Sequence, residues 1–237
     1  MKKIMQDFFK LSFKQLMLSN VFLGSRKDSF NMIMKPFILG YRGSFCILNL
    51  SYTYIQFKLL IHVLFNIIFL RKKVLIVKEN DLYNFKISLE AKNLYFYNKK
   101  WIGGCLTNFK IVSRHPKFLE LSKSFSNLRQ LKYLPSFIFL FDPNISEAAL
   151  FEGYVLGVPT SAIANSDCLF FESINYPVLG NTECYESMYF YMYVLRDAIK
   201  LGSIKEYVEI LRIRRLKAKL KIKLRIRRKI KKYKFVC

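Results

Sequence analysis

Histidine, cysteine, glycine and proline are all scarce in this sequence of 237 residues, which has 2 His, 5 Cys, 9 Gly and 6 Pro. With so few histidines and no CxxC pair, we do not expect a zinc site made by this chain alone. No close cysteine pairing is visible, and one of the five must stay unpaired in any disulfide scheme. We therefore predict reduced thiols in an intracellular compartment.

The sequence also lacks the loops that nucleotide and acyl-transfer enzymes use. It contains no GxGxxG, no GxxxxGK followed by Ser or Thr, and no GxSxG. Gly103 and Gly104 are adjacent, but they lack the strand, turn and helix order of a dinucleotide loop. His62 inside an apolar segment and His115 in a basic loop leave little scope for a general base. We predict no catalytic residue, no metal site, no cofactor and no small-molecule substrate.

Asp142 is the one carboxylate placed where an α/β enzyme would keep a catalytic acid, directly after a predicted strand. No partner acid or base is near it, and Asp-Pro-Asn is typical of a turn. We interpret Asp142 as a turn or capping residue. An α/β enzyme acting on nucleotides stays an alternative, which nucleotide binding by the isolated domain would support.

Positive charge is abundant, because 40 Lys and Arg stand against 16 Asp and Glu, a formal net charge of +24. Such an excess points to a polyanionic partner, either nucleic acid or an anionic membrane surface. Phe, Tyr, Ile, Asn and Lys are used heavily, while Ala, Gly and Pro are sparse. That bias is typical of AT-rich genomes, organellar ones among them.

The amino terminus, residues 1–20, carries four lysines among apolar residues. Its acidic Asp7 and the lack of a small-residue cleavage site argue against a signal peptide, and a transit peptide would be richer in Arg and Ser. We therefore expect a protein made in the compartment where it works.

The basic residues are densest from Lys205 onward. Between Lys217 and Arg227 basic and apolar residues alternate, which is a strand period, yet Leu216, Leu220 and Leu224 are spaced for a helix. Both conformations stay open. Free in solution, the tail should repel itself and be disordered, and it is either a solvated tail without a fixed partner or, as we predict, a segment that orders on RNA.

Residues 54–70 are apolar and about as long as the shortest membrane-spanning helices. Lys58 and His62 lie within this segment, and the β-branched run Val74–Val77 follows it closely, as in one helix–strand repeat of an α/β core. We favour a buried core helix without membrane insertion. The alternative is a membrane-associated basic protein with residues 54–70 inserted.

The predicted elements alternate along the chain. Strands are expected at 45–50, 74–77, 94–97, 136–141 and 160–164, and helices at 10–20, 53–70, 81–92, 146–156 and 183–201. Ser146 is expected to cap its helix, and Gly202 to stop the last one. Parallel strands need crossover helices, so the fold class is α/β, a parallel doubly wound sheet flanked by helices of the flavodoxin-like or Rossmann-like kind.

Three stretches carry a resemblance to a known family. Residues 101–109 read WIGGCLTNF, residues 31–50 read NMIMKPFILGYRGSFCILNL, and further matches follow in order from Leu134 to Asn181. The chain resembles the family of small-subunit ribosomal protein S-two over roughly residues 15–202. The resemblance implies an α/β sandwich near the junction of head and body of the small subunit, without catalytic activity, bound to ribosomal RNA and neighbouring ribosomal proteins.

The chain also departs from the family pattern. FLGS at residues 22–25 replaces a segment with two histidines, Asn-Ser-Asp at 165–167 replaces Asp-Thr-Asn, and Lys100 replaces an arginine. The family inserts a long coiled-coil hairpin between Phe109 and Leu134. Here about two dozen residues are available, too few for two long helices at about 1.5 Å per residue. We predict that the hairpin is reduced to a stub.

The predicted RNA-binding residues lie in the two best-matched loops and in the tail. The loop residues are Lys35, Arg42, Lys99, Lys100, Gly103, Gly104, Thr107, Asn108, Lys110 and Arg114. The tail residues are Arg212, Arg214, Arg215, Lys217, Lys219, Lys221, Lys223, Arg225, Arg227, Arg228 and Lys229. Folded RNA is recognised largely through phosphates, riboses and shape, so cations on a rigid frame suit it.

Several of these residues have a second interpretation. The glycine pair allows close approach of a phosphate or tight packing under Trp101, and Trp101 itself is expected to be a core anchor. Thr107 and Asn108 either cap a helix or bond to RNA.

We divide the chain into a helical segment (1–20), an α/β domain (21–203) and a basic extension (204–237). We expect an organelle-encoded protein of the mitochondrial matrix, in the mitoribosome.

Overall fold

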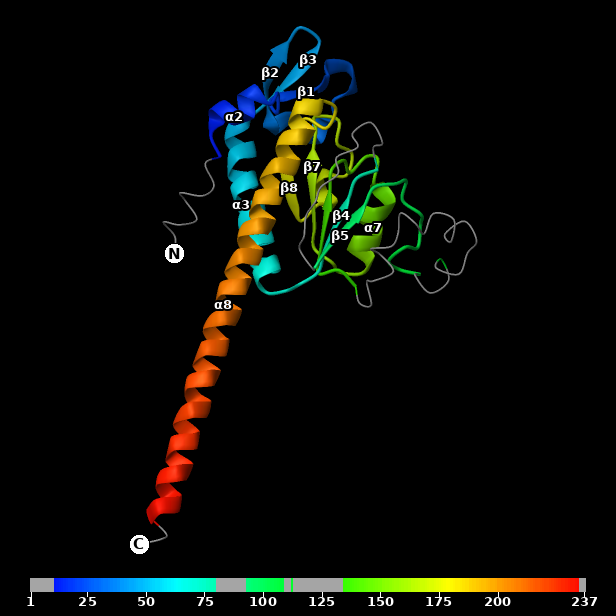
Figure 1. The fold of residues 1–237 in the computed structure, drawn as a ribbon. Helices are drawn as coiled ribbons and strands as arrows, with labels where there is room; N and C mark the ends of the chain where they lie inside the picture. Colours follow the sequence, from blue (N-terminus) through cyan, green and yellow to red (C-terminus); the bar gives the residue numbers. More distant parts are fainter. Residues whose placement is uncertain (1–10, 80–92, 109–111, 113–133, 235–237) are drawn as a thin grey trace.

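The computed structural model describes residues 11–79, 93–108, 112 and 134–234, the last of these with backbone only from 217 onward (Figure 1). The helices are α2 (Phe13–Leu18), α3 (Leu50–Phe69), α7 (Glu147–Val155) and α8 (Tyr185–Lys234). The strands are β1 (Leu23–Arg26), β2 (Ile38–Arg42), β3 (Phe45–Leu48), β4 (Val74–Val77), β5 (Leu94–Tyr97), β6 (Phe137–Leu140), β7 (Thr160–Ala164) and β8 (Tyr176–Leu179). Short 3-10 turns lie at Lys27–Ser29, Met32–Phe37 (η2) and Phe171–Ser173.

The main sheet has five strands in the order β5-β4-β6-β7-β8, and all its pairings are parallel. The chain winds outward in both directions from the β4–β6 pair, which is the flavodoxin-like order. Every residue of β4 and β6 is buried, because helices and loops cover both faces of the sheet. The predicted α/β fold with a parallel doubly wound sheet is confirmed.

The expected strand at 45–50 forms, as β3, but it does not belong to the parallel sheet. It pairs antiparallel with β1 and β2 in a separate three-stranded sheet. Sequence analysis missed β1, β2 and β8. Gly40 weakens the strand signal of β2, and β8 contains Pro177, which is tolerated there because β8 is an edge strand.

Two apolar cores fill the two sides of the sheet. Phe57 and Leu64 of α3 meet Tyr191 and Leu195 of α8 in one core. The other core joins α7 and the loop around Trp101 to the opposite face. Figure 1 shows α3 and α8 side by side on one side of the sheet and α7 on the other.

Helix α3 is, within the described residues, the single helix long and apolar enough to cross a membrane. Seven of its residues are buried inside the protein: Thr53, Phe57, Leu60, Ile61, Leu64, Phe65 and Ile68. Its backbone packs against α8 and β8. In this fold α3 therefore serves as a core helix.

The predicted helix stop at Gly202 is wrong, because α8 continues without a break to Lys234. Gly202 instead lies at the crossing with α3: a Cβ there would stand 3.0 Å from the Cβ of Ile68 and 3.2 Å from the carbonyl oxygen of Phe65. The glycine allows two helices to approach closely. The basic extension therefore begins inside α8. Of its two sequence periods, the helical spacing of Leu216, Leu220 and Leu224 agrees with the helical backbone, and the strand-like alternation does not.

Ser146 occupies the N-cap position of α7, but its side chain makes no capping hydrogen bond. The expected helix at 81–92 and the predicted hairpin stub lie outside the described residues.

Candidate nucleic-acid interface

The loop from Asn98 to Asn108 leaves the carboxyl end of β5 and carries most of the predicted loop residues. Tyr97 anchors its start: the hydroxyl donates to the carbonyl oxygen of Lys100 at 2.7 Å and accepts from the amide of Ile102 at 3.2 Å. Trp101 packs on the Tyr97 ring, with centroids 4.7 Å apart, and is buried in the core. The prediction that Trp101 is a core anchor is confirmed.

The carboxylate of Glu152, on α7, organises this loop. Oε1 accepts from Trp101 Nε1 at 2.8 Å and from the Gly104 amide at 2.7 Å. Oε2 accepts from the amides of Leu106 at 2.7 Å and Thr107 at 3.1 Å, and from Thr107 Oγ1 at 3.4 Å. Charge-assisted bonds of this kind are roughly twice as strong as neutral ones. The Trp-Gly-Gly segment is thus wrapped around a buried anion.

Several loop residues have partners inside the protein. Gly104 has φ +87 and its amide faces Glu152, while a Cβ would stand 3.0 Å from Val112 Cγ2, so packing explains this glycine. Thr107 is also engaged by Glu152. The Asn108 amide donates to the Gly104 carbonyl at 2.8 Å. Gly103 has open space beside it and remains free to approach a partner.

Sequence analysis did not identify Glu152 as the centre of this loop. It is one of two glutamates in α7, the other being the exposed Glu147, and it is separated from its donors by about fifty residues. Only the fold brings the two segments together.

The loop cations lie at the carboxyl edge of the main sheet. Lys100 is exposed and Lys99 is half-buried, both just after β5. Lys35, on η2, and Arg42, at the end of β2, are also exposed. Lys110 and Arg114 lie outside the described residues.

The antiparallel sheet and η2 are fastened to the loop that follows β7. The amide of Ser25 donates to Ser166 Oγ at 2.8 Å, and the amide of Asn31 donates to the Ser166 carbonyl at 2.9 Å. Asn31 Nδ2 reaches the Cys168 carbonyl at 2.8 Å. Lys35 is therefore presented at the same edge of the parallel sheet as Lys100.

The tail cations lie at the opposite end. Helix α8 starts after β8, packs along α3, and reaches Arg71 just before β4, where Arg71 Nε bonds Glu206 Oε1 at 2.9 Å. The amino edge of the sheet is thus level with Glu206, and the rest of α8 extends beyond it by about 40 Å at about 1.5 Å per residue. Figure 1 shows this projecting helix.

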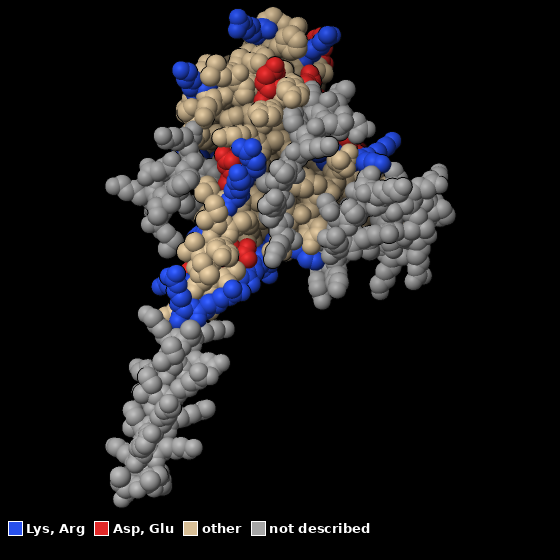
Figure 2. Space-filling view, in the orientation of Figure 1, with Lys and Arg blue, Asp and Glu red and all other residues tan. Residues whose placement is uncertain are grey.

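Charge divides α8 into two parts. Residues 185–211 contain four acidic and three basic residues, whereas residues 212–234 contain 14 basic residues and no acidic one. We call these the aromatic half and the cationic half. Arg212, Arg214 and Arg215 are exposed, and Figure 2 shows basic side chains where α8 leaves the body. The structure therefore separates the predicted RNA-binding residues into two groups at opposite ends of the molecule.

The chain turns directly after β6, at the carboxyl end of the strand next to β4, where such folds usually hold ligands. Asp142 Oδ1 accepts from the amides of Asn144 at 2.9 Å and Ile145 at 3.4 Å, so the prediction of a turn residue is confirmed. Burial raises the pKa of the carboxyls of Asp142 and Glu79. Among the described residues no group of three or more His, Cys, Asp or Glu is arranged to hold a metal ion.

The four described cysteines, Cys46, Cys105, Cys168 and Cys184, are free thiols. Burial raises the pKa of Cys105 and of Cys168 to about 12. Such thiols carry almost no thiolate at neutral pH, so they are poor nucleophiles. Cys46, Cys105 and Cys168 are buried and act as small apolar side chains of the core.

Comparison with known proteins matches this architecture. The sequence profile of the family Ribosomal protein S2 matches residues 16–124 and 117–202. The small ribosomal subunit protein uS2 of Ehrlichia ruminantium (strain Gardel) is 26% identical over 226 residues, covering 82% of this chain and 78% of that protein. The uS2 of Buchnera aphidicola subsp. Cinara cedri is 26% identical over 234 residues, covering 86% and 97%, and that of Agrobacterium fabrum is 26% identical over 224, covering 82% and 88%.

The profile covers the α/β body, including the loop around Glu152, and ends at Gly202. The relatives are bacterial proteins of the small ribosomal subunit. The chain therefore belongs to the ribosomal protein S2 family and is a non-enzymatic, structural component of a small ribosomal subunit.

Proposed function

We propose that this chain binds small-subunit rRNA chiefly through the cationic half of α8, in a mitochondrial ribosome. The observation that carries the proposal is the charge division of α8, with 14 basic and no acidic residues in 212–234. A helix of this composition repels itself in free solution and is stabilised when phosphates surround it. Each phosphate that it neutralises releases counterions, which makes the affinity depend strongly on salt.

A second, weaker contact is proposed at the carboxyl edge of the sheet. Lys35, Arg42, Lys99 and Lys100 hold charge on a rigid frame there, with Gly103 open beside them. Lys110 and Arg114 follow in the sequence and belong to the same proposal. Two contacts at opposite ends would let the body bridge separate rRNA segments. This fits a position near the junction of head and body, with neighbouring ribosomal proteins on the remaining surface.

The mitochondrial assignment rests on composition. The chain has 23 Phe and 15 Tyr but 9 Gly and 6 Pro, the bias of an AT-rich genome. We propose an organelle-encoded protein of the matrix. Fractionation of purified mitochondria, with and without an outer-membrane rupture step, should leave the chain protected from protease until the inner membrane is opened.

Membrane insertion is not part of the proposal. The buried face of α3 packs on α8 and β8, and withdrawing it into lipid would open the core that contains Phe57 and Leu64. Carbonate extraction tests this: the chain should be released with ribosomal subunits, whereas an inserted protein would stay in the membrane pellet.

The direct test of rRNA binding is ultraviolet cross-linking in purified small subunits, followed by mapping of RNA-linked peptides. Peptides from residues 212–234 should carry rRNA most often, and peptides from residues 185–211 should serve as the internal control because they share the same helix. If RNA adducts were absent from the cationic half, or equally frequent in both halves, the proposed interface would be wrong.

A further inference from the structure

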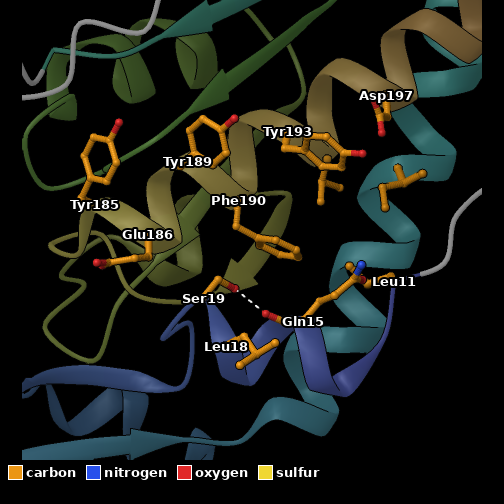
Figure 3. Close-up of a pocket in the computed structure, with 12 residues that line it drawn as sticks. Leu11, Gln15, Leu18, Ser19, Tyr185, Glu186, Tyr189, Phe190, Tyr193 and Asp197 are labelled. Carbon is orange, nitrogen blue, oxygen red and sulfur yellow. Dashed lines mark hydrogen bonds between the residues drawn. The ribbon is translucent and has the colours of Figure 1, made fainter.

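A groove of about 490 Å³ lies between α2 and the aromatic half of α8, with Ile61 of α3 at its base (Figure 3). Leu11 and Leu18 form one wall, Tyr185, Tyr189 and Tyr193 form the other, and Ile61 and Phe190 belong to the lining shared with the core. Its surface is therefore mostly apolar, and the tyrosine hydroxyls contribute polar groups.

The three tyrosines stay exposed although they are large and mostly apolar. They are spaced four residues apart along α8, and their exposed fractions are 52%, 54% and 47%. Ile204, Tyr207 and Val208 are also exposed, further along the same helix. Exposed apolar side chains grouped along one groove mark a candidate interaction site on a folded protein.

The groove is rigid because α2 is fastened to α8. Ser187 Oγ donates to the carbonyl oxygen of Ser19 at 2.7 Å, and Asn181 Nδ2 donates to that of Asn20 at 3.4 Å. Ser12 and Gln15 close the first turn of α2 with a capping box. The site is thus formed before any partner arrives, which lowers the entropic cost of binding.

The charge of the groove selects the partner. The lining includes Glu186 and Asp197 and, among the described residues, no Lys or Arg. Arg196 lies over the Tyr193 ring, 4.6 Å from its centroid, and pairs with Asp197 at 3.4 Å, but both charged side chains are more than a third exposed, so the ion pair is weak. Two carboxylates on an otherwise strongly basic chain disfavour RNA phosphates. A second copy would bring the same carboxylates and is disfavoured as well.

We propose that this groove docks an amphipathic helix of another small-subunit protein, with apolar residues four apart and Lys or Arg flanking them. Helix-in-groove recognition uses such i, i+4 anchors. Apolar side chains would pack between Leu18 and the tyrosines, and the flanking cations would meet Glu186 and Asp197, which lie three helical turns apart. The inference rests on the proposed ribosomal role, since the partner is sought within the subunit.

The test places the photoreactive amino acid p-benzoylphenylalanine at position 189 of the full chain, incorporated into small subunits and irradiated after gradient purification. The matched control carries the same group at position 154, an exposed tyrosine of α7 on the other side of the sheet. The proposal predicts one dominant cross-link from position 189 to a helical, basic and apolar segment of another protein, which position 154 does not give.

Charge reversal provides a second measurement. The double variant Glu186→Lys and Asp197→Lys should lower the yield of that cross-link about tenfold, whereas Glu183→Lys, an exposed neighbour outside the groove, should leave it unchanged. Cross-links solely to rRNA, to a second copy, or to residues 1–10 of the same chain would overturn the proposal, as would none at all. These outcomes are scored in gradient-purified subunits, so absence of the chain from subunits would refute the proposed function separately.

Discussion

The α/β body and the cationic half of α8 are stabilised by opposite means. The body buries two apolar cores and encloses the Glu152 carboxylate in hydrogen bonds from five donors. The cationic half consists of a helix with 14 basic and no acidic residues that extends beyond the sheet. Apolar burial responds little to salt, whereas binding of cations to phosphates weakens steeply with it. High salt should therefore weaken RNA binding by the cationic half while leaving the folded body largely intact.

The boundary between the body and the cationic half lies within helix α8. The family profile ends at Gly202, where α8 crosses α3, and the charge division comes within the next three turns. The same helix is thus a core element at its start and a binding element at its end. Packing at its start fixes the direction in which the cationic half leaves the body.

Removing the cationic half should have the largest effect on binding. A chain that ends at Leu211 should bind purified small-subunit rRNA at least about a thousandfold more weakly at physiological salt, with a flatter salt dependence, because its phosphate contacts are lost. Filter binding from low to high salt measures both. The matched control exchanges Lys for Arg and Arg for Lys throughout 212–234. Comparable weakening in that control would show that charge alone is not the cause.

Glu152→Gln should have the largest effect on the body. The amide keeps one acceptor oxygen but turns its own N–H groups toward amides that also donate, leaving buried donors unsatisfied. We expect a loss of about 2–4 kcal/mol in the free energy of unfolding. Urea unfolding of the full chain measures it. Glu147→Gln, an exposed change on the same helix, should cost no more than about 0.5 kcal/mol, and equal losses would contradict this account.

Gly202→Ala tests the close crossing of α8 and α3. Alanine gains about 1 kcal/mol of helix propensity but forces its Cβ against Ile68, at a cost of about 1–3 kcal/mol. We expect a small net destabilisation of about 1 kcal/mol in thermal or urea unfolding. Ser203→Ala, one residue on, should be nearly neutral. A clear stabilisation by Gly202→Ala would mean that the helices do not cross as closely as described.

The Arg71–Glu206 ion pair joins the segment before β4 to α8, six residues before the cationic half begins. Its side chains are 56% and 25% exposed, so a double-mutant cycle with Arg71→Gln and Glu206→Gln should give a coupling energy of about 0.5 kcal/mol. The coupling should shrink at high salt. A coupling above about 2 kcal/mol would show that this contact, and not apolar packing at Gly202, fixes the direction of α8.

Asp142→Asn should have the smallest effect. Burial, aided by the nearby Asp167, raises the folded-state pKa of this carboxyl, although amide hydrogen bonds oppose the shift. The folded state then binds a proton more readily than the unfolded one, so stability falls as the pH rises from about 4 through the raised pKa. Asparagine keeps the turn acceptor without the charge. We expect equal or higher stability at pH 7, and a marked loss would contradict the turn interpretation.

Local sequence patterns predicted much of this fold. Val74–Val77, Leu94–Tyr97 and Thr160–Ala164 form strands at the expected positions, since continuous apolar runs suit a sheet covered on both faces. The predicted helix end at Gly202 was wrong because glycine occurs both at helix ends and where two helices cross closely. The position of α3 beside Gly202 shows that the second role applies here. The sheet that contains β3 was likewise hidden, because pairing depends on strands distant in space.

The candidate interface was predictable in composition but not in arrangement. Lys100 and Arg212 were both expected to meet RNA, yet sequence could not tell that they lie at opposite ends of the molecule. The role of Glu152 as acceptor for the loop was not predicted, because its five donors come from a segment about fifty residues away. The groove beside Tyr189 was also missed, since exposure of an aromatic stripe appears only once the helices are packed.

The most direct test of the central claim is a sucrose-gradient profile of native extract at rising salt, probed for this chain together with a small-subunit marker. The account predicts stoichiometric co-migration with the small subunit at physiological salt, persisting until high salt strips phosphate-bound proteins. Stoichiometric recovery of the chain outside ribosomes at physiological salt, free or in membranes, would contradict it.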